Sequence, residues 1–273
     1  DLLSSLPAEL VIIILEKTDT SDCFVALTVS RLLNELLMHE SIWRKTTCRT
    51  YGLTTKPPEF SWLKYASLLQ NKTFRINQER YASKHIQVAQ STEKGPFDEA
   101  ILVKSCPGGE PGVTGNIMYP GSVYMFGLRL VGSDGIMFGV SGPECKLIPQ
   151  LGGSKDGWGY CKDCTWKFHN QQWKSNGSLK GDVMNVVYDS VKGRIIVFNT
   201  TQEKRVWSGV NTTGKVAIHV SLWKPQDYVK GLYCFALTKD EQDLLEDNDF
   251  CDNILKKHSI TLSLSSTLCK EDN

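Results

Sequence analysis

The sequence lacks a long hydrophobic run and has almost no net charge. Its 273 residues include 31 Lys and Arg against 30 Asp and Glu, which leaves a formal net charge of +1. A membrane span needs about 20 consecutive apolar residues, and no signal peptide precedes the first predicted helix, so we expect no membrane association. Basic residues are frequent between residues 41 and 90 but spread out, which favours a solvated helix face over nucleic-acid binding.

A regular disulfide framework is also missing. The nine cysteines are odd in number and scattered, which is typical of reduced thiols in the cytoplasm or nucleus. Cys161 and Cys164 form a Cys-x-x-Cys pair that could bind zinc together with Cys145 and His169. That spacing matches no zinc module, and the sequence has no catalytic Cys–His signature and no phosphate-binding glycine loop. We predict no metal, no cofactor and no catalytic residue; a metal-dependent enzyme is the remaining alternative.

The first fifty residues contain a strongly apolar helical segment. Pro7 suits the first turn of a helix, where its missing amide hydrogen costs nothing. Leu6, Leu10, Ile13 and Ile14 lie at helical spacings on one face, and the intervening positions are mostly apolar as well. A helix that is apolar on most sides must be covered, and a segment this short buries little surface by itself. A partner, or the rest of the chain, is expected to cover it.

Three short motifs follow one another in this segment. They are Leu6-Pro7-Ala8-Glu9-Leu10, Val29-Ser30-Arg31 and Ser41-Ile42-Trp43-Arg44. Their order and spacing resemble an F-box, a helical module that docks a protein onto Skp1 and thereby onto the cullin of a ubiquitin ligase. The set that the resemblance assigns to the Skp1-facing surface or the F-box core is Leu6, Pro7, Leu10, Ile13, Ile14, Val29, Ile42 and Trp43.

The remainder of the chain predicts a different architecture. A helix is expected from about residue 61 to 70, and many short β-strands separated by Gly, Asn and Asp follow, which favours an antiparallel sandwich. The predicted fold class is therefore α+β. The predicted domains are an F-box at 1–50, a helical bridge or linker at 51–94, a sandwich at 95–237 and an acidic C-terminal segment at 238–273. The acidic segment is expected to be an exposed helix or a loose tail.

Several motifs within the predicted sandwich occur in a characteristic order. They are Gly135-Ile136-Met137-Phe138-Gly139-Val140, Asp156-Gly157-Trp158-Gly159-Tyr160, Gly181-Asp182-Val183, and a hairpin from Tyr188-Asp189 through Gly193 to Phe198. Together they resemble a SPRY domain, a β-sandwich that binds other proteins through its loops. Trp158 is expected in the core. The loop aromatics that we expect to bind a substrate are Tyr119, Trp166, Phe168, Trp173 and Trp207.

The two resemblances together imply a non-catalytic adaptor. The F-box would bind Skp1 and a cullin, the SPRY-like sandwich would hold a substrate protein, and ubiquitin transfer would be carried out by partner subunits. A lectin-like F-box receptor that reads glycans is an alternative, because aromatic loop residues also suit sugars. The expected location is the cytoplasm, the nucleus or both.

Overall fold

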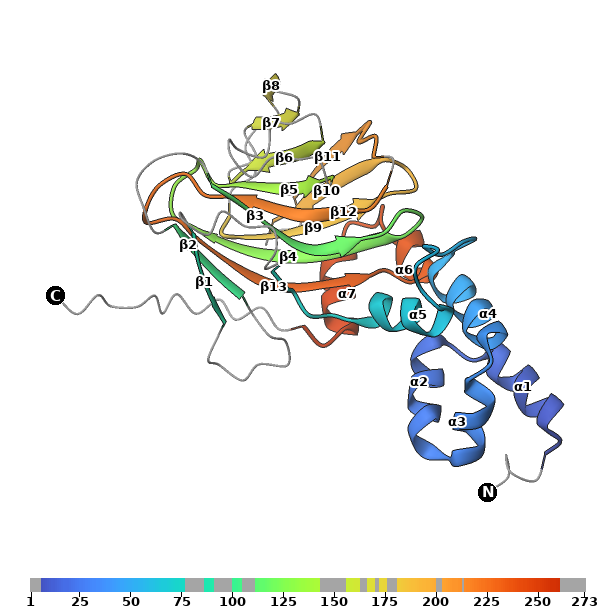
Figure 1. Ribbon diagram of the computed structural model, residues 1–273. Coiled ribbons are helices and arrows are strands. Elements are labelled where there is room, and N and C mark those ends of the chain that lie inside the picture. Colours follow the sequence, from blue (N-terminus) through green and yellow to red (C-terminus); the bar gives the residue numbers. More distant parts are fainter. Residues whose placement is uncertain are drawn as a thin grey trace.

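The computed structural model describes residues 6–76, 86–90, 100–104, 111–142, 156–162, 166–169, 172–175, 181–199, 203–212 and 214–260. Figure 1 shows N-terminal helices at one end of a β-sandwich and two short helices from the C-terminal region beside it. This arrangement confirms the predicted α+β class with antiparallel sheets. Within the described ranges, every helix is too short or too polar to cross a membrane.

Five helices form the N-terminal part, called the helical unit below, and local sequence signals mark their ends. The Ser30 and Ser61 side chains accept hydrogen bonds from the amides of Leu33 and Lys64, as N-caps do. Gly52 ends a helix with a φ of 69°, a conformation that glycine adopts without strain. The helices are α1 (Ala8–Lys17), α2 (Thr20–Val29), α3 (Arg31–Leu37), α4 (Glu40–Tyr51) and α5 (Trp62–Gln70).

The sandwich consists of a seven-stranded and a six-stranded antiparallel sheet. Their strand orders are β1-β2-β13-β4-β9-β10-β11 and β3-β12-β5-β6-β7-β8. The strands are β1 (Ile86–Gln90), β2 (Ala100–Lys104), β3 (Gly112–Met118), β4 (Val123–Val131), β5 (Met137–Ser141), β6 (Gly157–Cys161), β7 (Trp166–His169), β8 (Gln172–Ser175), β9 (Val183–Asp189), β10 (Arg194–Phe198), β11 (Lys204–Ser208), β12 (Val216–Ser221) and β13 (Tyr228–Ala236). Because β1 already pairs with β2, the seven-stranded sheet begins before residue 95, the predicted boundary.

Central strands of both sheets are buried along their whole length. β5, β6, β9 and β12 contain only buried residues, as expected of strands covered on both faces. Trp158 is 4% exposed, which confirms its predicted place in the core. Gly139 lies beside Trp158, and a Cβ at this position would come within 2.0 Å of the Trp158 carbonyl oxygen. No residue larger than glycine fits there. The close approach of β5 and β6 within the six-stranded sheet therefore depends on a glycine in the middle of β5.

The acidic C-terminal segment differs from its prediction over residues 239–257. These residues form α6 (Lys239–Asp243) and α7 (Phe250–Lys257). The buried side chains of α7 join residues of the seven-stranded sheet in a second apolar cluster that includes Phe250, Ile254, Phe198 and Phe235. Over residues 238–260 the segment is neither an exposed helix nor a loose tail, because an apolar stripe of α7 packs on the sheet while the acids other than Glu241 face outward.

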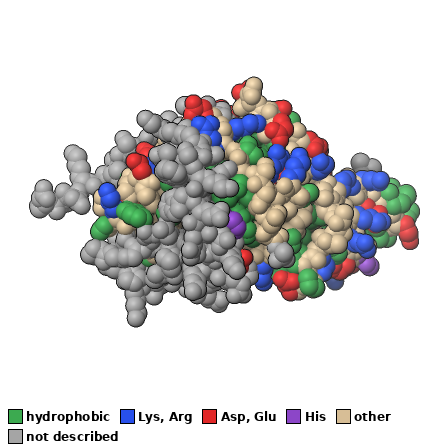
Figure 2. Space-filling model, turned by 90° about the horizontal axis from the view of Figure 1, so that it is seen from above, with side chains coloured by type: hydrophobic (Ala, Val, Ile, Leu, Met, Phe, Trp, Pro, Cys, Tyr) green, Lys and Arg blue, Asp and Glu red, His purple; other side chains and the backbone are tan. Residues whose placement is uncertain are grey.

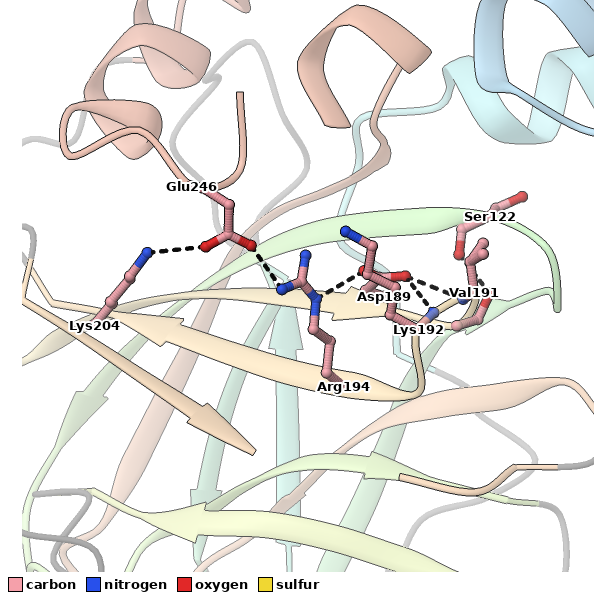
Figure 3. A network of polar contacts seen from close by, with 8 residues as sticks. Ser122, Asp189, Val191, Lys192, Arg194, Lys204 and Glu246 are labelled. Carbon is pink, nitrogen blue, oxygen red and sulfur yellow. Dashed lines mark hydrogen bonds and ion pairs between the residues drawn. The ribbon is translucent and has the colours of Figure 1, made fainter. Parts of the chain in front are cut away.

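A polar network fastens the segment after α6 to the β9–β10 hairpin (Figure 3). Arg194 contacts both Asp189, at 2.9 Å, and Glu246, at 2.8 Å. Asp189 also accepts hydrogen bonds from the amides of Val191 and Lys192 within the turn, and Lys204 reaches Glu246 at 3.3 Å. The buried Arg194–Asp189 pair thus links the hairpin turn to the connection between α6 and α7.

A buried carboxylate, Glu241, connects α6 with the end of α7. Its oxygens accept hydrogen bonds from the Thr238 amide at 2.8 Å and from His258 Nε2 at 2.9 Å, and Lys257 lies 2.8 Å away. Burial alone would raise the pKa of Glu241. The contacts with His258, Lys257 and the Thr238 amide outweigh burial and lower that pKa from 4.5 to about 2.

We expect Glu241→Gln to reduce the free energy of unfolding at neutral pH by about 3 kcal/mol. Since the folded-state pKa of about 2 lies below the ordinary 4.5, this stabilisation is complete above about pH 4.5 and is lost as the pH falls toward 2. Urea unfolding at neutral pH and at about pH 3 should show a smaller difference between wild type and variant in acid. The exposed Asp243→Asn is the matched control, and an unchanged difference at the two pH values would contradict the argument.

The helical unit meets the sandwich through aromatic side chains. Tyr65 of α5 lies 3.3 Å from the Ser122 hydroxyl and packs edge-on against Tyr119. After α5 the chain continues along the sandwich, where the Lys72 carbonyl accepts from the Cys234 amide at 3.1 Å. Phe74 is 3% exposed and fills the space beside Gly231 of β13. These contacts make α5 and residues 71–76 the connection between the two parts.

Candidate functional site

The first three helices expose a set of large apolar side chains, called the apolar helix set below. Figure 2 shows hydrophobic side chains at the helical end of the molecule. The inward side of α1 is already used, because Val11 and Leu15 are buried. A set of this size on one end of a chain is typical of a surface that another protein covers. The members and their exposed fractions are Leu6 36%, Leu10 48%, Ile13 52%, Ile14 44%, Val25 61%, Val29 69% and Met38 57%.

The structure separates the predicted N-terminal site residues into two groups. Leu6, Leu10, Ile13, Ile14 and Val29 belong to the apolar helix set, and Pro7 is exposed next to them. Ile42 and Trp43 are instead fully buried within the helical unit. The Trp43 ring packs against Phe24 at 4.6 Å, and its indole nitrogen donates to the Leu37 carbonyl. Ile42 and Trp43 therefore hold the helices together, whereas the predicted residues on and before α1, together with Val29, are exposed.

Another exposed hydrophobic residue, Trp223, lies at the end of the sandwich opposite the helical unit. It follows β12 and is 42% exposed. The buried Asp227 carboxylate holds its loop, because it accepts hydrogen bonds from the amides of Trp223 and Lys224 at 2.8 and 2.6 Å. The same carboxylate accepts from Ser133 in the β4–β5 loop, at 2.7 Å for both the amide and the hydroxyl. Trp223 is thus presented by a loop that is fixed before any partner binds.

Strand pairing places Trp223 and the helical unit at opposite ends of the sandwich. The start of β13 pairs with Val131 at the end of β4, so the loop that carries Trp223 lies at that end. Ser122, which contacts α5, directly precedes the start of β4. Figure 1 shows the helical unit at the end of the sandwich where β13 finishes. The apolar helix set and Trp223 therefore lie at opposite ends of the described sandwich.

The predicted substrate-binding aromatics have different surroundings. Tyr119 is only 8% exposed and packs against Phe60 and Tyr65 at the junction with α5, so its prediction as an exposed loop residue is corrected. Trp207 is half-buried, edge-on to Tyr160 and to His169. The side chains of Trp166, Phe168 and Trp173 lie outside the described residues. Trp223 was not among the predicted binding residues, although it is exposed.

The cysteine–histidine group has only two members within the described part. Cys161 is buried, and His169 stacks on Trp158 with its Nδ1 2.9 Å from the Gly157 carbonyl. Cys145 and Cys164 lie outside the described residues. In the described ranges, no cluster of three or more His, Cys, Asp or Glu is arranged to hold a metal ion. Burial raises the pKa of the Cys23 thiol to about 11 and that of Cys251 to about 12, which keeps both protonated at neutral pH.

Comparison with known proteins gives likenesses in structure only. No family model matches the sequence, and no curated protein matches it. The PSpry domain of TRIM65 is similar with a TM-score of 0.46 and 13% identity, over 62% of this chain and 97% of that domain. The SPRY domain of human HERC1 is similar with a TM-score of 0.40 and 18% identity, over 55% of this chain and 96% of that domain.

Proposed function

We propose that this chain is a non-catalytic substrate adaptor of a Skp1–cullin–F-box ubiquitin ligase, active in the cytoplasm or nucleus. The apolar helix set binds Skp1, and the far end of the sandwich binds the substrate protein. The observation that carries the proposal is the exposure of Leu10, Ile13, Ile14 and Val29 while Ile42 and Trp43 are buried. The buried pair maintains the helical unit, and the exposed residues offer about 1 kcal/mol each when a partner covers them.

An adaptor of this kind acts by position alone. It raises the local concentration of a substrate near a ubiquitin-charged enzyme, so its own side chains need no acid, base or nucleophile. Two features support this mechanism. The proposed docking surface and the Trp223 loop lie at opposite ends of the sandwich, and α5 with Phe74 joins the helical unit to the sheets through buried contacts. A substrate would therefore be held at a defined distance from Skp1.

Affinity purification of the whole chain from cells tests the docking step. We expect wild-type protein to recover Skp1 and a cullin, together with proteins captured by the sandwich. Purified Skp1 mixed with the purified chain should also form a complex on gel filtration. If neither experiment shows Skp1 bound, the proposed function is wrong.

We expect Trp223→Ala to reduce recovery of the sandwich-dependent partners by about tenfold or more, while Skp1 recovery stays unchanged. A half-exposed tryptophan on a fixed loop is the kind of residue that dominates binding energy at protein interfaces. Quantitative mass spectrometry of the purified complexes measures both effects. Val191→Ala is the matched control, because Val191 is 66% exposed in the β9–β10 turn at the opposite end of the sheet. An equal loss of partner recovery in both variants would show that Trp223 is not part of the proposed binding site.

A further inference from the structure

A polar cavity of about 580 Å³ lies where the helical unit meets the sandwich and the C-terminal helices. The starts of α2 and α6, the ends of α4, α5, β13 and α7, and the residues that follow α5, β13 and α7 contribute to its walls. Its volume falls in the range of small-molecule sites, roughly 300–1,000 Å³, and such sites are common at the junctions of structural units. The surfaces proposed above for Skp1 and for the substrate do not include any residue of this cavity.

Some polar groups of the cavity wall already have partners within the protein. Glu241 is saturated by Lys257, His258 and the Thr238 amide. The Arg49 guanidinium donates to the carbonyls of Glu16 and Thr18 beyond the end of the cavity. The Glu241 carboxylate therefore has little capacity left for a ligand, whereas His258 Nδ1 is buried without a partner and Arg49 keeps further N–H donors.

Three other side chains in the wall, Tyr51, Thr50 and Lys72, also carry donors that no described protein group accepts. Tyr51 is 4% exposed, and within the described part of the chain its hydroxyl has no hydrogen-bond partner. Burial, with the nearby Glu241 charge, raises the pKa of Tyr51 far above its usual value, so the hydroxyl stays a donor. Thr50 Oγ1 only accepts, from the amide and the hydroxyl of Thr20, so its own proton is available. The half-buried Lys72 ammonium has no ion-pair partner among the described residues.

Two carboxylates at the edge of the cavity are hydrogen-bond acceptors and carry negative charge. Asp19 and Asp240 are both exposed, and neither forms an ion pair within the described ranges. With Arg49, Lys257 and Glu241 already paired within the fold, the charges left in the wall are one cation, Lys72, and two acids, Asp19 and Asp240. A ligand matched to these groups carries one group of each sign.

We infer that the cavity binds a small zwitterion, whose carboxylate or phosphate accepts hydrogen bonds from Tyr51 and Lys72 while its ammonium lies toward the exposed Asp19 and Asp240. The Tyr51 hydroxyl lines the cavity and donates to no described protein group, so the anionic end of a ligand can take its hydrogen bond in place of water. Charge-assisted bonds to the anionic end add to this hydrogen bond. The inference goes beyond the adaptor proposal and does not depend on it.

Isothermal titration calorimetry with the whole purified chain tests the ligand class. The probes are phosphoethanolamine and γ-aminobutyrate, which carry an ammonium together with a phosphate or a carboxylate. The controls carry only one of the two charged groups. They are inorganic phosphate and ethanolamine for phosphoethanolamine, and butyrate and butylamine for γ-aminobutyrate. We expect at least one zwitterion to bind about tenfold or more tightly than either of its controls, and the better one identifies the anion. Binding of no zwitterion, or equal binding of a control, would overturn the inference.

Two variants place the ligand in this cavity. Tyr51→Phe keeps the buried ring and removes only the hydroxyl, and we expect it to weaken binding of the better probe by about five- to tenfold. Lys72→Met should weaken it by about tenfold or more. Lys64→Met, on the exposed side of α5, is the matched control and should bind like wild type. Wild-type affinity in both cavity variants would show that the site lies elsewhere, and neither outcome bears on Skp1 binding.

Discussion

Replacing Leu10 and Ile14 together by glutamate should weaken the complex with Skp1 by about 100-fold or more while the chain stays folded. These side chains are 48% and 44% exposed, so the carboxylates would remain hydrated in the free protein. In the proposed complex the same positions are covered, and two unpaired charges would have to be desolvated there. Such a penalty exceeds the loss expected from shortening the side chains alone.

A charge-matched control makes this experiment specific. The double variant changes the net charge by −2, and Lys64→Glu on the exposed side of α5 changes it by the same amount. Binding of purified Skp1 can be followed by surface plasmon resonance, and thermal unfolding reports the fold. Equal weakening by both variants would indicate general electrostatic repulsion. Unchanged binding in the double variant would exclude α1 from the docking surface.

Substituting Gly231 by alanine should destabilise the chain by about 3 kcal/mol, because Phe74 already occupies the space that a side chain needs. A Cβ at this position would lie 2.0 Å from Phe74 Cδ1 and 2.3 Å from its Cγ. Neither atom is the mobile tip of a side chain, and the ring is 3% exposed. The ring must therefore leave its site, which would loosen the connection between the helical unit and β13.

A double-mutant cycle identifies the cause of this effect. Phe74→Ala alone should cost about 3–5 kcal/mol by creating a cavity. In that background the Gly231→Ala methyl group has space, so the cost of the double variant should fall well below the sum of the single costs. Gly214→Ala is the control, because a Cβ there meets nothing within 4 Å. Additive losses in urea unfolding would mean that the glycine serves another purpose.

Local patterns were sufficient to predict most of the secondary structure. The apolar spacing after Pro7 predicted the first helix, and the helix predicted at about residues 61 to 70 is α5 over Trp62–Gln70. Such signals arise within one turn of helix or one strand, so no distant residue is needed to recognise them. The burial of α7 was not predicted, because the surrounding acids indicated an exposed helix or a loose tail, although Phe250, Cys251, Ile254 and Leu255 have the spacing of an apolar helix face.

Contacts between distant segments explain what could not be predicted about the interaction surfaces. Tyr119 and Trp223 are both aromatic residues next to strands, and nothing in their local sequence separates them. Tyr119 is buried because α5 packs over it, whereas Trp223 stays exposed on a loop that Asp227 and Ser133 hold in place. The exposure of a side chain depends on which distant part of the chain packs against it, and the spacing of residues in the sequence does not indicate that contact.

By itself, the sequence determined the α+β class, the approximate positions of the helices and strands, and an excess of apolar residues in the first helices. The tertiary structure alone decided that Ile42 and Trp43 hold the helical unit together, that Leu10, Ile14 and Val29 remain uncovered, and that a polar cavity forms between α4, α6 and α7. The physical reason is that secondary structure follows from neighbours along the chain, whereas burial and cavities follow from the fit between surfaces far apart in sequence.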